Sequence, residues 1–175
     1  MAKIKYFIQF VFIISFFLLF KIVRLRIASF ISGKFFQIIG PIFRSKEIIH
    51  SNIKKAFPKI NEQDLKIITR SMWNNYGRVF AEYMFMKDFR INTSSEKIQI
   101  IGSEILEDIK KNNKKVIFIS GHFSNFELMA MQIEKVGIKL AAIYRPLNNK
   151  FLNLIMERIR KKYICKIQIK KGLGG

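Results

Sequence analysis

The predicted architecture depends most on one apolar run, Lys115-Val116-Ile117-Phe118-Ile119-Ser120, which continues directly into Gly121-His122-Phe123-Ser124-Asn125-Phe126-Glu127. A near-continuous apolar run of this length is typical of a strand that is buried on both faces of a parallel sheet. The next residues, from Asn125 to Val136, have helical periodicity and end at Gly137. The sequence therefore predicts a strand, a turn that carries His122, and a helix.

Working outward from this stretch, strand-like and helical segments alternate. We predict strands at 98–101, 139–144 and 164–169, and helices at 103–111 and 149–161. Strand and helix in this order indicate parallel βαβ units. The expected fold class is therefore α/β, with a βαβαβ unit of a mostly parallel sheet. The chain stops just after the last predicted strand, so we expect a truncated sheet with an open edge.

The N-terminal segment is apolar from Tyr6 to Phe20 apart from Gln9 and Ser15. Extended to Val23, it has about 18 residues, or roughly 27 Å as a helix, which is marginal for a hydrocarbon core of about 30 Å. We expect an uncleaved, transmembrane anchor, with a buried helix or a signal-peptide segment as the alternatives. Basic residues on both flanks, slightly more after the segment, favour a cytoplasmic location for the body of the protein.

Between the anchor and the α/β part we predict a helical, membrane-proximal region. Residues 27–43 suit a short helix on the membrane interface. An amphipathic helix over 45–57 is ended by Pro58, and Asn61 is a suitable N-cap for a long helix from Glu62 to about Met86. The predicted organisation is an anchor at 1–26, a helical region at 27–97 and an α/β domain at 98–175.

The chain is strongly basic, with 32 Lys and Arg residues against 12 Asp and Glu, a formal net charge of +20. Such a charge favours a negative partner, for which nucleic acid, anionic lipid and an acidic carrier protein are candidates. The charge is spread along the chain without a nucleic-acid-binding motif, so we expect no nucleic-acid partner. Cys165, the single cysteine, excludes an intrachain disulfide. We expect neither a metal nor a cofactor.

The predicted chemical centre is the pair His122 and Glu127. His122 would lie at the carboxyl end of a strand, where ligand sites gather in parallel sheets. Five residues separate the pair, so the side chains can meet only if His122 lies in the turn and Glu127 in the first helical turn. An imidazole could then take a proton from a hydroxyl while the carboxylate orients the ring. The spacing alone leaves two alternatives open, a capping box from Ser124 to Glu127 and a structural role for His122.

Four short stretches of the sequence resemble motifs of one protein family. The chain resembles the late lipid A acyltransferases, the lauroyl and myristoyl transferases of Gram-negative bacteria, which carry a His-x4-Asp/Glu motif in a phrase like residues 121–127. The other similar phrases are Asn52-Ile53-Lys54-Lys55-Ala56-Phe57-Pro58, Asn75-Tyr76-Gly77-Arg78 followed by Glu82, and Tyr144-Arg145-Pro146-Leu147-Asn148-Asn149. Their order and spacing agree over nearly the whole chain.

The resemblance implies an enzyme in the bacterial inner membrane, with a glycerolipid-acyltransferase-like fold and its catalytic part facing the cytoplasm. It would transfer a fatty acyl group from acyl carrier protein to a hydroxyl of a lipid A precursor. His122 would be the general base, Glu127 its orienting partner, and Arg145 and Asn125 candidate substrate-binding residues. Arg145 could also be a helix-cap or surface residue.

Family members are usually nearly twice as long, so the resemblance also implies that this chain is the N-terminal part of such an enzyme. Two alternative functions remain at this point. One is a phospholipid-type acyltransferase that acts on lysophospholipid or glycerol phosphate, although such enzymes usually have Asp where Glu127 stands. The other is an inactive, membrane-associated fragment.

Overall fold

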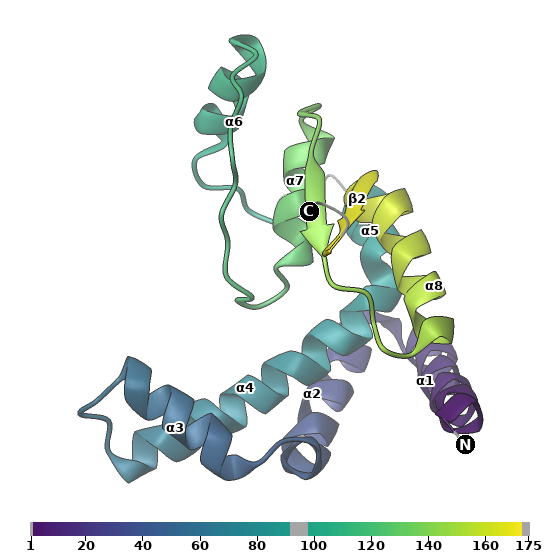
Figure 1. Ribbon diagram of the computed structural model, residues 1–175, viewed down its shortest axis with the longest axis vertical. Helices are drawn as coiled ribbons and strands as arrows, with labels where there is room; N and C mark the ends of the chain where they lie inside the picture. The colour runs from purple at the N-terminus through teal and green to yellow at the C-terminus, as the bar shows by residue number, and fades with distance from the viewer. Residues whose placement is uncertain (1, 92–97, 173–175) are drawn as a thin grey trace. The chain divides into compact units, whose positions relative to one another are not determined.

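The computed structural model describes residues 2–91 and 98–172 (Figure 1). The chain divides into two compact units. One unit contains residues 17–84, and the other contains residues 1–16 and 85–175. The α-helices are α1 (Ala2–Ile22), α2 (Arg24–Phe43), α3 (Lys46–Ala56), α4 (Glu62–Glu82), α5 (Met86–Ile91), α6 (Ser103–Lys111), α7 (Glu127–Lys135) and α8 (Lys150–Ile159). The other elements are the 3₁₀ turn η1 (Tyr83–Phe85), the π-helical turn η2 (Arg160–Ile164), and the strands β1 (Ala141–Tyr144) and β2 (Ile167–Lys170).

The unit of residues 17–84 is helical, and its centre is the contact between α2 and α4. Small residues of α2 are buried there: Ala28, Ser29, Ser32, Gly33 and Gly40. The Ser32 hydroxyl donates a hydrogen bond of 2.6 Å to the Gly77 carbonyl oxygen, and the Ser29 hydroxyl donates to a Glu82 carboxylate oxygen at 3.0 Å. Small side chains let the two helix backbones approach closely, as in helix pairs of membrane proteins.

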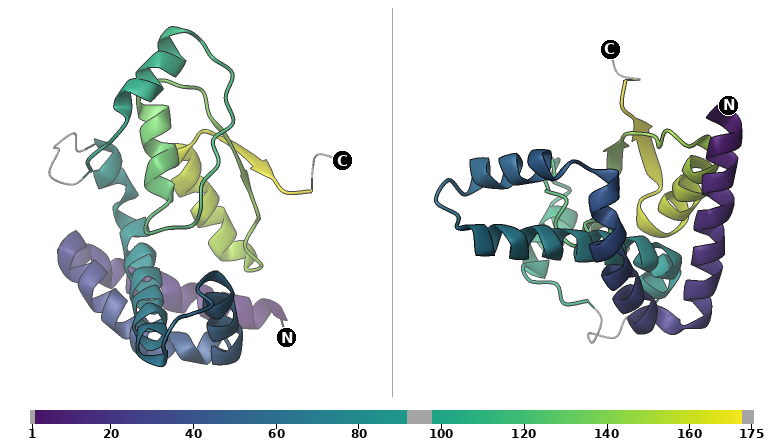
Figure 2. Two further views of the ribbon diagram at one scale, coloured as in Figure 1. Left: turned by 90° about the vertical axis from the view of Figure 1, so that its left-hand side faces the viewer. Right: turned by 90° about the horizontal axis from the view of Figure 1, so that it is seen from below.

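Helix caps fix the boundaries of α3 and α4, which lie side by side in this unit (Figures 1 and 2). The Ser45 hydroxyl accepts the Ile48 N–H, and the Asn61 amide oxygen accepts the Asp64 N–H at 2.8 Å. The predicted N-cap at Asn61 is therefore confirmed. The predicted long helix is also confirmed as far as Glu82, where it tightens into η1 and continues as α5.

In the other unit, β1 and β2 form a parallel pair in which Ala141 is the partner of Ile167 and Tyr144 of Lys170. The chain between the two strands forms α8 and η2, so one βαβ unit is present. The predicted helix at 103–111 has the observed bounds of α6, and α7 and α8 lie within the other two predicted helices. The coarse prediction of an α/β fold holds, although most of the described residues are helical.

Two predicted strands are wrong. Residues 98–101 and 115–120 have no strand assignment, so the expected βαβαβ unit is reduced to a single βαβ. Ile117 and Ile119 are 90% and 92% exposed. A central strand is stable only when neighbouring strands take its backbone hydrogen bonds and helices cover its faces. In the described part of the chain, residues 115–120 have neither, and they run as an extended connection from α6 to α7.

Candidate active site

The turn before α7 carries the sequence motif. Glu127 is the first residue of α7, and Phe126 is at its N-cap position. A capping box would instead require Ser124 at the N-cap, so this alternative does not describe the observed helix start. Ser124 has a φ of +46°, a left-handed conformation that is uncommon for a residue other than glycine. This turn reverses the chain between His122 and the helix and places the His122 ring 4.2 Å from the Phe126 ring, centroid to centroid.

The Glu127 carboxylate is buried, with the residue only 5% exposed, and it is paired with Arg160. The Nε–H of Arg160 donates to Oε1 of Glu127 at 2.9 Å, and the Nη2–H donates to the same oxygen. Arg160 begins η2, in which the Cys165 N–H bonds to the Arg160 carbonyl at 2.9 Å. Single π-helical turns often occur at functional sites. A buried carboxylate with a charge-assisted hydrogen-bond partner is held in one position.

Tyr144, at the end of β1, lies next to this ion pair. The Arg160 guanidinium lies 5.7 Å from the centre of the Tyr144 ring. The Tyr144 hydroxyl donates to Oε1 of Glu157, which also accepts from the Asn153 amide at 2.7 Å. Burial, and then the hydrogen bond to the Glu157 carboxylate, raise the pKa of Tyr144 to about 12. The same hydrogen bond lowers the pKa of Glu157, so this pair is a neutral phenol and a carboxylate at neutral pH.

These residues surround one cavity of about 390 Å³. His122, Glu127 and Arg145 all line it, together with Tyr144 and Arg160. The structure thus brings together three of the four residues that the sequence suggested for the site. His122 and Arg145 are exposed, whereas the Glu127 carboxylate is buried. The cavity therefore combines an accessible imidazole with a fixed carboxylate and cationic groups.

Asn125 has a different position from the other candidates. Within the described residues it is not part of the lining of this cavity, and its carbonyl oxygen accepts the Leu128 N–H at 3.1 Å. This contact shapes the start of α7. The substrate-binding role predicted for Asn125 stays a prediction, and the geometry favours a role in the turn.

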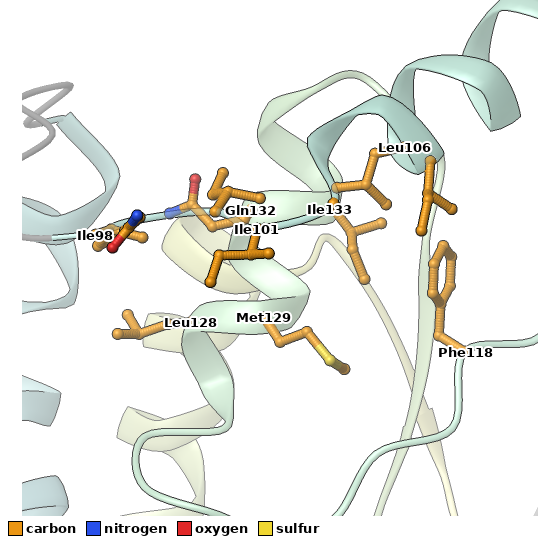
Figure 3. A pocket seen from close by; sticks show the side chains of 12 residues that line it. Ile98, Ile101, Leu106, Phe118, Leu128, Met129, Gln132 and Ile133 are labelled. Atoms are coloured by element: carbon orange, nitrogen blue, oxygen red, sulfur yellow. The ribbon is translucent and has the colours of Figure 1, made fainter.

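A second, larger cavity of about 580 Å³ lies on the other side of α7 and is mainly apolar (Figure 3). Its side chains come from residues 98–106, from Phe118 and from α7. Figure 3 shows Leu128 and Ile98 on one side of α7 and Phe118 and Leu106 on the other. Met129 lines both this cavity and the cavity at His122. The apolar cavity therefore adjoins the polar cavity at His122, and the flexible side chain of Met129 lies at the boundary between them.

Cys165 also lines the cavity at His122, but neither a metal cluster nor a reactive thiol is found there in the described residues. Across residues 2–91 and 98–172, no three His, Cys, Asp or Glu side chains gather to hold a metal ion. Cys165 is buried and its thiol donates to the Leu140 carbonyl oxygen at 3.1 Å. Burial raises the pKa of Cys165, which makes the thiol a poor nucleophile.

Sequence reasoning missed the role of Arg160. Among 32 basic residues, nothing in the pattern marks this arginine, because its partner Glu127 is 33 positions away in the chain. Tyr144 belongs to the motif at residues 144–149 that carries the family resemblance, but the sequence predicted no role for it. A faint signal was available in the Glu157 and Arg160 spacing of three, which places both side chains on one face of a helix.

Comparisons with known protein sequences show the family of this chain. The chain belongs to the bacterial lipid A biosynthesis acyltransferase family, whose description matches residues 1–172. It is 27% identical over 135 residues to the lipid A biosynthesis myristoyltransferase of Escherichia coli K12, an alignment covering 75% of this chain and 40% of that protein. It is also 27% identical over 115 residues to the lipid A biosynthesis lauroyltransferase of the same organism, covering 63% of this chain and 36% of that protein.

The similarity extends to Shigella flexneri, whose lipid A biosynthesis acyltransferase 2 is 28% identical over 116 residues, covering 64% of this chain and 36% of that protein. The chain thus spans about two fifths or less of the length of these relatives. No solved structure matches it.

Proposed function

We propose that this chain carries the catalytic pair of an enzyme that transfers a fatty acyl group from acyl carrier protein to a hydroxyl of a lipid A precursor. The observation that supports this most is the shared cavity of His122 and Glu127, in a chain that belongs to this family. The exposed imidazole is accessible to a hydroxyl, and the buried carboxylate, held by Arg160, lines the same cavity.

In the proposed reaction, His122 is the general base. Its imidazole takes the proton of the acceptor hydroxyl as the hydroxyl oxygen attacks the thioester carbonyl. The new C–O ester bond forms, the C–S bond breaks, and the imidazolium returns the proton to the departing thiolate. General-base catalysis of this kind contributes about 10²–10⁴-fold to the rate.

Glu127 acts as the orienting partner of His122. It favours one ring tautomer and stabilises the imidazolium while the proton is held. Arg160 acts on Glu127 rather than on substrate, because its guanidinium binds the carboxylate through two N–H groups. A carboxylate held in this way loses little orientation during the reaction, which is the benefit of a preorganised site.

The apolar cavity beside Met129 is the place we assign to the acyl chain. Its volume of about 580 Å³ is within the ~300–1,000 Å³ typical of ligand pockets, and its lining is mostly aliphatic. Each buried methylene of the chain would contribute about 0.8 kcal/mol. This arrangement puts the hydrocarbon on one side of α7 and the reacting carbonyl near His122.

The net charge of +20 suits both proposed substrates. Phosphates of a lipid A precursor are acidic, as is the surface of acyl carrier protein, and complementary charge speeds their encounter with the enzyme. Arg145 is the candidate phosphate-binding residue, because it is exposed and lines the cavity. We place the enzyme in the bacterial inner membrane with this site facing the cytoplasm, where acyl carrier protein is found.

The test is acyl transfer by the 175-residue chain in detergent, with acyl carrier protein as donor and three separate acceptors. These are a lipid A precursor with a hydroxyacyl chain, a lysophospholipid and glycerol phosphate. Transfer to the first acceptor alone supports the proposal. Transfer to the second or third alone would replace it with a phospholipid-type acyltransferase, and no transfer by a folded sample would contradict activity of this chain.

A further inference from the structure

A cavity of about 520 Å³ lies in the helical unit of residues 17–84 and has no role in the proposed function. Two arginines and two apolar side chains line it: Arg26, Ile27 and Phe30 of α2, and Arg78 of α4. The two helices pack against each other within this unit (Figure 1). The lining thus combines strong cations with an apolar surface.

The Arg78 side chain is held in place from two directions. Its Nε–H donates to Oδ1 of Asn74 at 2.9 Å, one turn earlier on α4. Its stem packs over Gly33 of α2, where an added Cβ would lie 3.2 Å from Cγ of Arg78. A guanidinium is a rigid, planar fork of N–H donors, so a fixed Nε also orients the two Nη groups. These donors are preorganised to bind an anion.

The positive charge at this cavity is not neutralised by the protein. Lys34 is a third cation beside the two arginines, with its Nζ 5.7 Å from the centre of the Phe30 ring. Across residues 2–91 and 98–172, no carboxylate forms an ion pair with Arg26, Lys34 or Arg78. Glu82 lies one turn after Arg78, but its carboxylate accepts a serine hydroxyl of α2 at 3.0 Å. The cavity therefore favours an anionic ligand, and arginine forks match the oxygens of a phosphate.

The apolar part of the lining indicates what the phosphate is attached to. Ile27 and Phe30 are 51% and 54% exposed, and their spacing of three puts them on one face of α2. A free phosphate or a sugar phosphate gains little from such a surface, whereas a hydrocarbon chain removes it from water. A ligand with both a phosphate and an acyl chain fits this lining best.

The position of Arg26 in the chain also supports a lipid. Residues 3–22 have the length and composition of a membrane span, and they end four residues before Arg26. Four residues extend at most about 14 Å. In the membrane location proposed above, Arg26 is therefore within reach of lipid headgroups, where basic side chains attract anionic lipids.

We infer that Arg26 and Arg78 bind the phosphate of a lipid whose acyl chain lies against Ile27 and Phe30. A phosphomonoester is the best match, because it carries a charge of about −1.5 to −2 near neutral pH and faces two guanidinium groups. Lys34 adds to the attraction without the planar fork. The inference rests on the proposed membrane location but not on acyl transfer, so it is tested by binding rather than by activity.

The experiment measures how short-chain phosphatidic acid shifts the unfolding temperature of the 175-residue chain in neutral detergent. A lipid that binds the folded protein raises this temperature in proportion to its affinity and concentration, which gives an apparent Kd. Two further probes separate the parts of the ligand. Diacylglycerol with the same chains has no phosphate, and glycerol phosphate has no chains.

The variant that tests the site is Arg26→Gln/Arg78→Gln, at two exposed positions. The matched control is Arg44→Gln/Arg70→Gln, which removes the same charge from exposed positions of the same unit outside the cavity lining. A second variant, Phe30→Ser, tests the apolar part at a half-exposed position and leaves both arginines in place.

We expect phosphatidic acid to bind the wild-type chain and the control with equal affinity, and to bind Arg26→Gln/Arg78→Gln about tenfold more weakly or worse. Phe30→Ser should also bind it more weakly, and the wild-type chain should bind diacylglycerol and glycerol phosphate more weakly than phosphatidic acid.

Four results would overturn the inference. They are no binding of phosphatidic acid by the wild-type chain, an equal loss in both double variants, unchanged affinity of Phe30→Ser, and binding of either partial ligand as tightly as the lipid. An equal loss would indicate a general effect of charge. Tight binding of glycerol phosphate would indicate a site for soluble phosphates, and tight binding of diacylglycerol would indicate an apolar site without phosphate recognition.

Discussion

Nε of Arg160 lies 2.9 Å from Oε1 of Glu127, and this contact joins the first turn of α7 to the π-helical turn after α8. Both side chains are largely buried, at 17% exposure for Arg160 and 7% for Glu127. The ion pair thus connects the sequence motif to a residue far along the chain. It makes the position of the proposed orienting carboxylate depend on the βαβ unit.

Replacing Arg160 with alanine should destabilise the protein by about 3 kcal/mol, because it leaves the buried Glu127 carboxylate without its guanidinium. Arg158→Ala is the matched control, since Arg158 is exposed in the last turn of α8, directly before η2, and its loss should change stability by less than about 0.5 kcal/mol. Urea unfolding of the three proteins measures both values. Equal stability of the Arg160→Ala and Arg158→Ala proteins would mean that the pair contributes nothing.

Tyr144→Phe should change how stability depends on alkaline pH. The pKa of Tyr144 is raised from 10.0 to about 12 in the folded protein, so folding favours the protonated phenol. Its contribution is fully present below pH 10.0 and is lost as the pH rises toward about 12. The difference in unfolding free energy between wild type and Tyr144→Phe should therefore shrink over this range. Both proteins contain the same lysines, so the titration of the lysines cancels in this difference. A difference in unfolding free energy that stays constant over this pH range would contradict the raised pKa of Tyr144.

Met129 should control the length of the acyl chain, because it lies between the apolar cavity and the site at His122. Met129→Trp adds bulk there and should shift the preferred donor toward shorter chains. Met129→Leu, a nearly volume-conserving control, should keep the wild-type preference. Competition between acyl carrier proteins that carry different chain lengths measures the shift. An unchanged preference with Met129→Trp would place the acyl chain elsewhere.

Gly77→Ala should destabilise the α2–α4 contact more than Gly33→Ala does. A Cβ at residue 77 would lie 2.2 Å from the Ser32 carbonyl oxygen, which is backbone and cannot turn aside. A Cβ at residue 33 would meet the Asn74 side-chain nitrogen at 2.8 Å, and that side chain can rotate. Overpacking of this kind typically costs about 1–3 kcal/mol. Thermal unfolding of the two variants ranks them, and a less stable Gly33→Ala protein would contradict the close approach.

The helices were predictable because their signals are local. The caps at Ser45 and Asn61, the break at Pro58 and the turn at Asn112 and Asn113 each depend on neighbours within a few residues. The predicted first residues of α7 and α8 were also close to the observed ones. The 3₁₀ tightening at η1 and the π-helical turn η2 were not predicted, because these irregularities arise from packing around residues such as Phe85 and Ile164, which are buried.

The strands were less predictable because a strand needs partners that its own residues do not specify. The runs at 139–144 and 115–120 have similar apolar patterns, yet only the first pairs, through Ala141 to Tyr144 with β2. The sequence predicted His122, Glu127 and Arg145 as residues of one site, and all three line the same cavity. It missed Arg160, since pairing with Glu127 depends on a long-range contact rather than on spacing.

The most direct test of the central claim compares His122→Ala with His50→Ala in acyl transfer from acyl carrier protein to a lipid A precursor. His50 lies in α3 and is the other histidine of the chain, so it controls for loss of an imidazole. The account predicts a loss of about 10²–10⁴-fold for His122→Ala, with His50→Ala close to wild type and both proteins equally folded. Full activity of the His122→Ala protein would contradict the account.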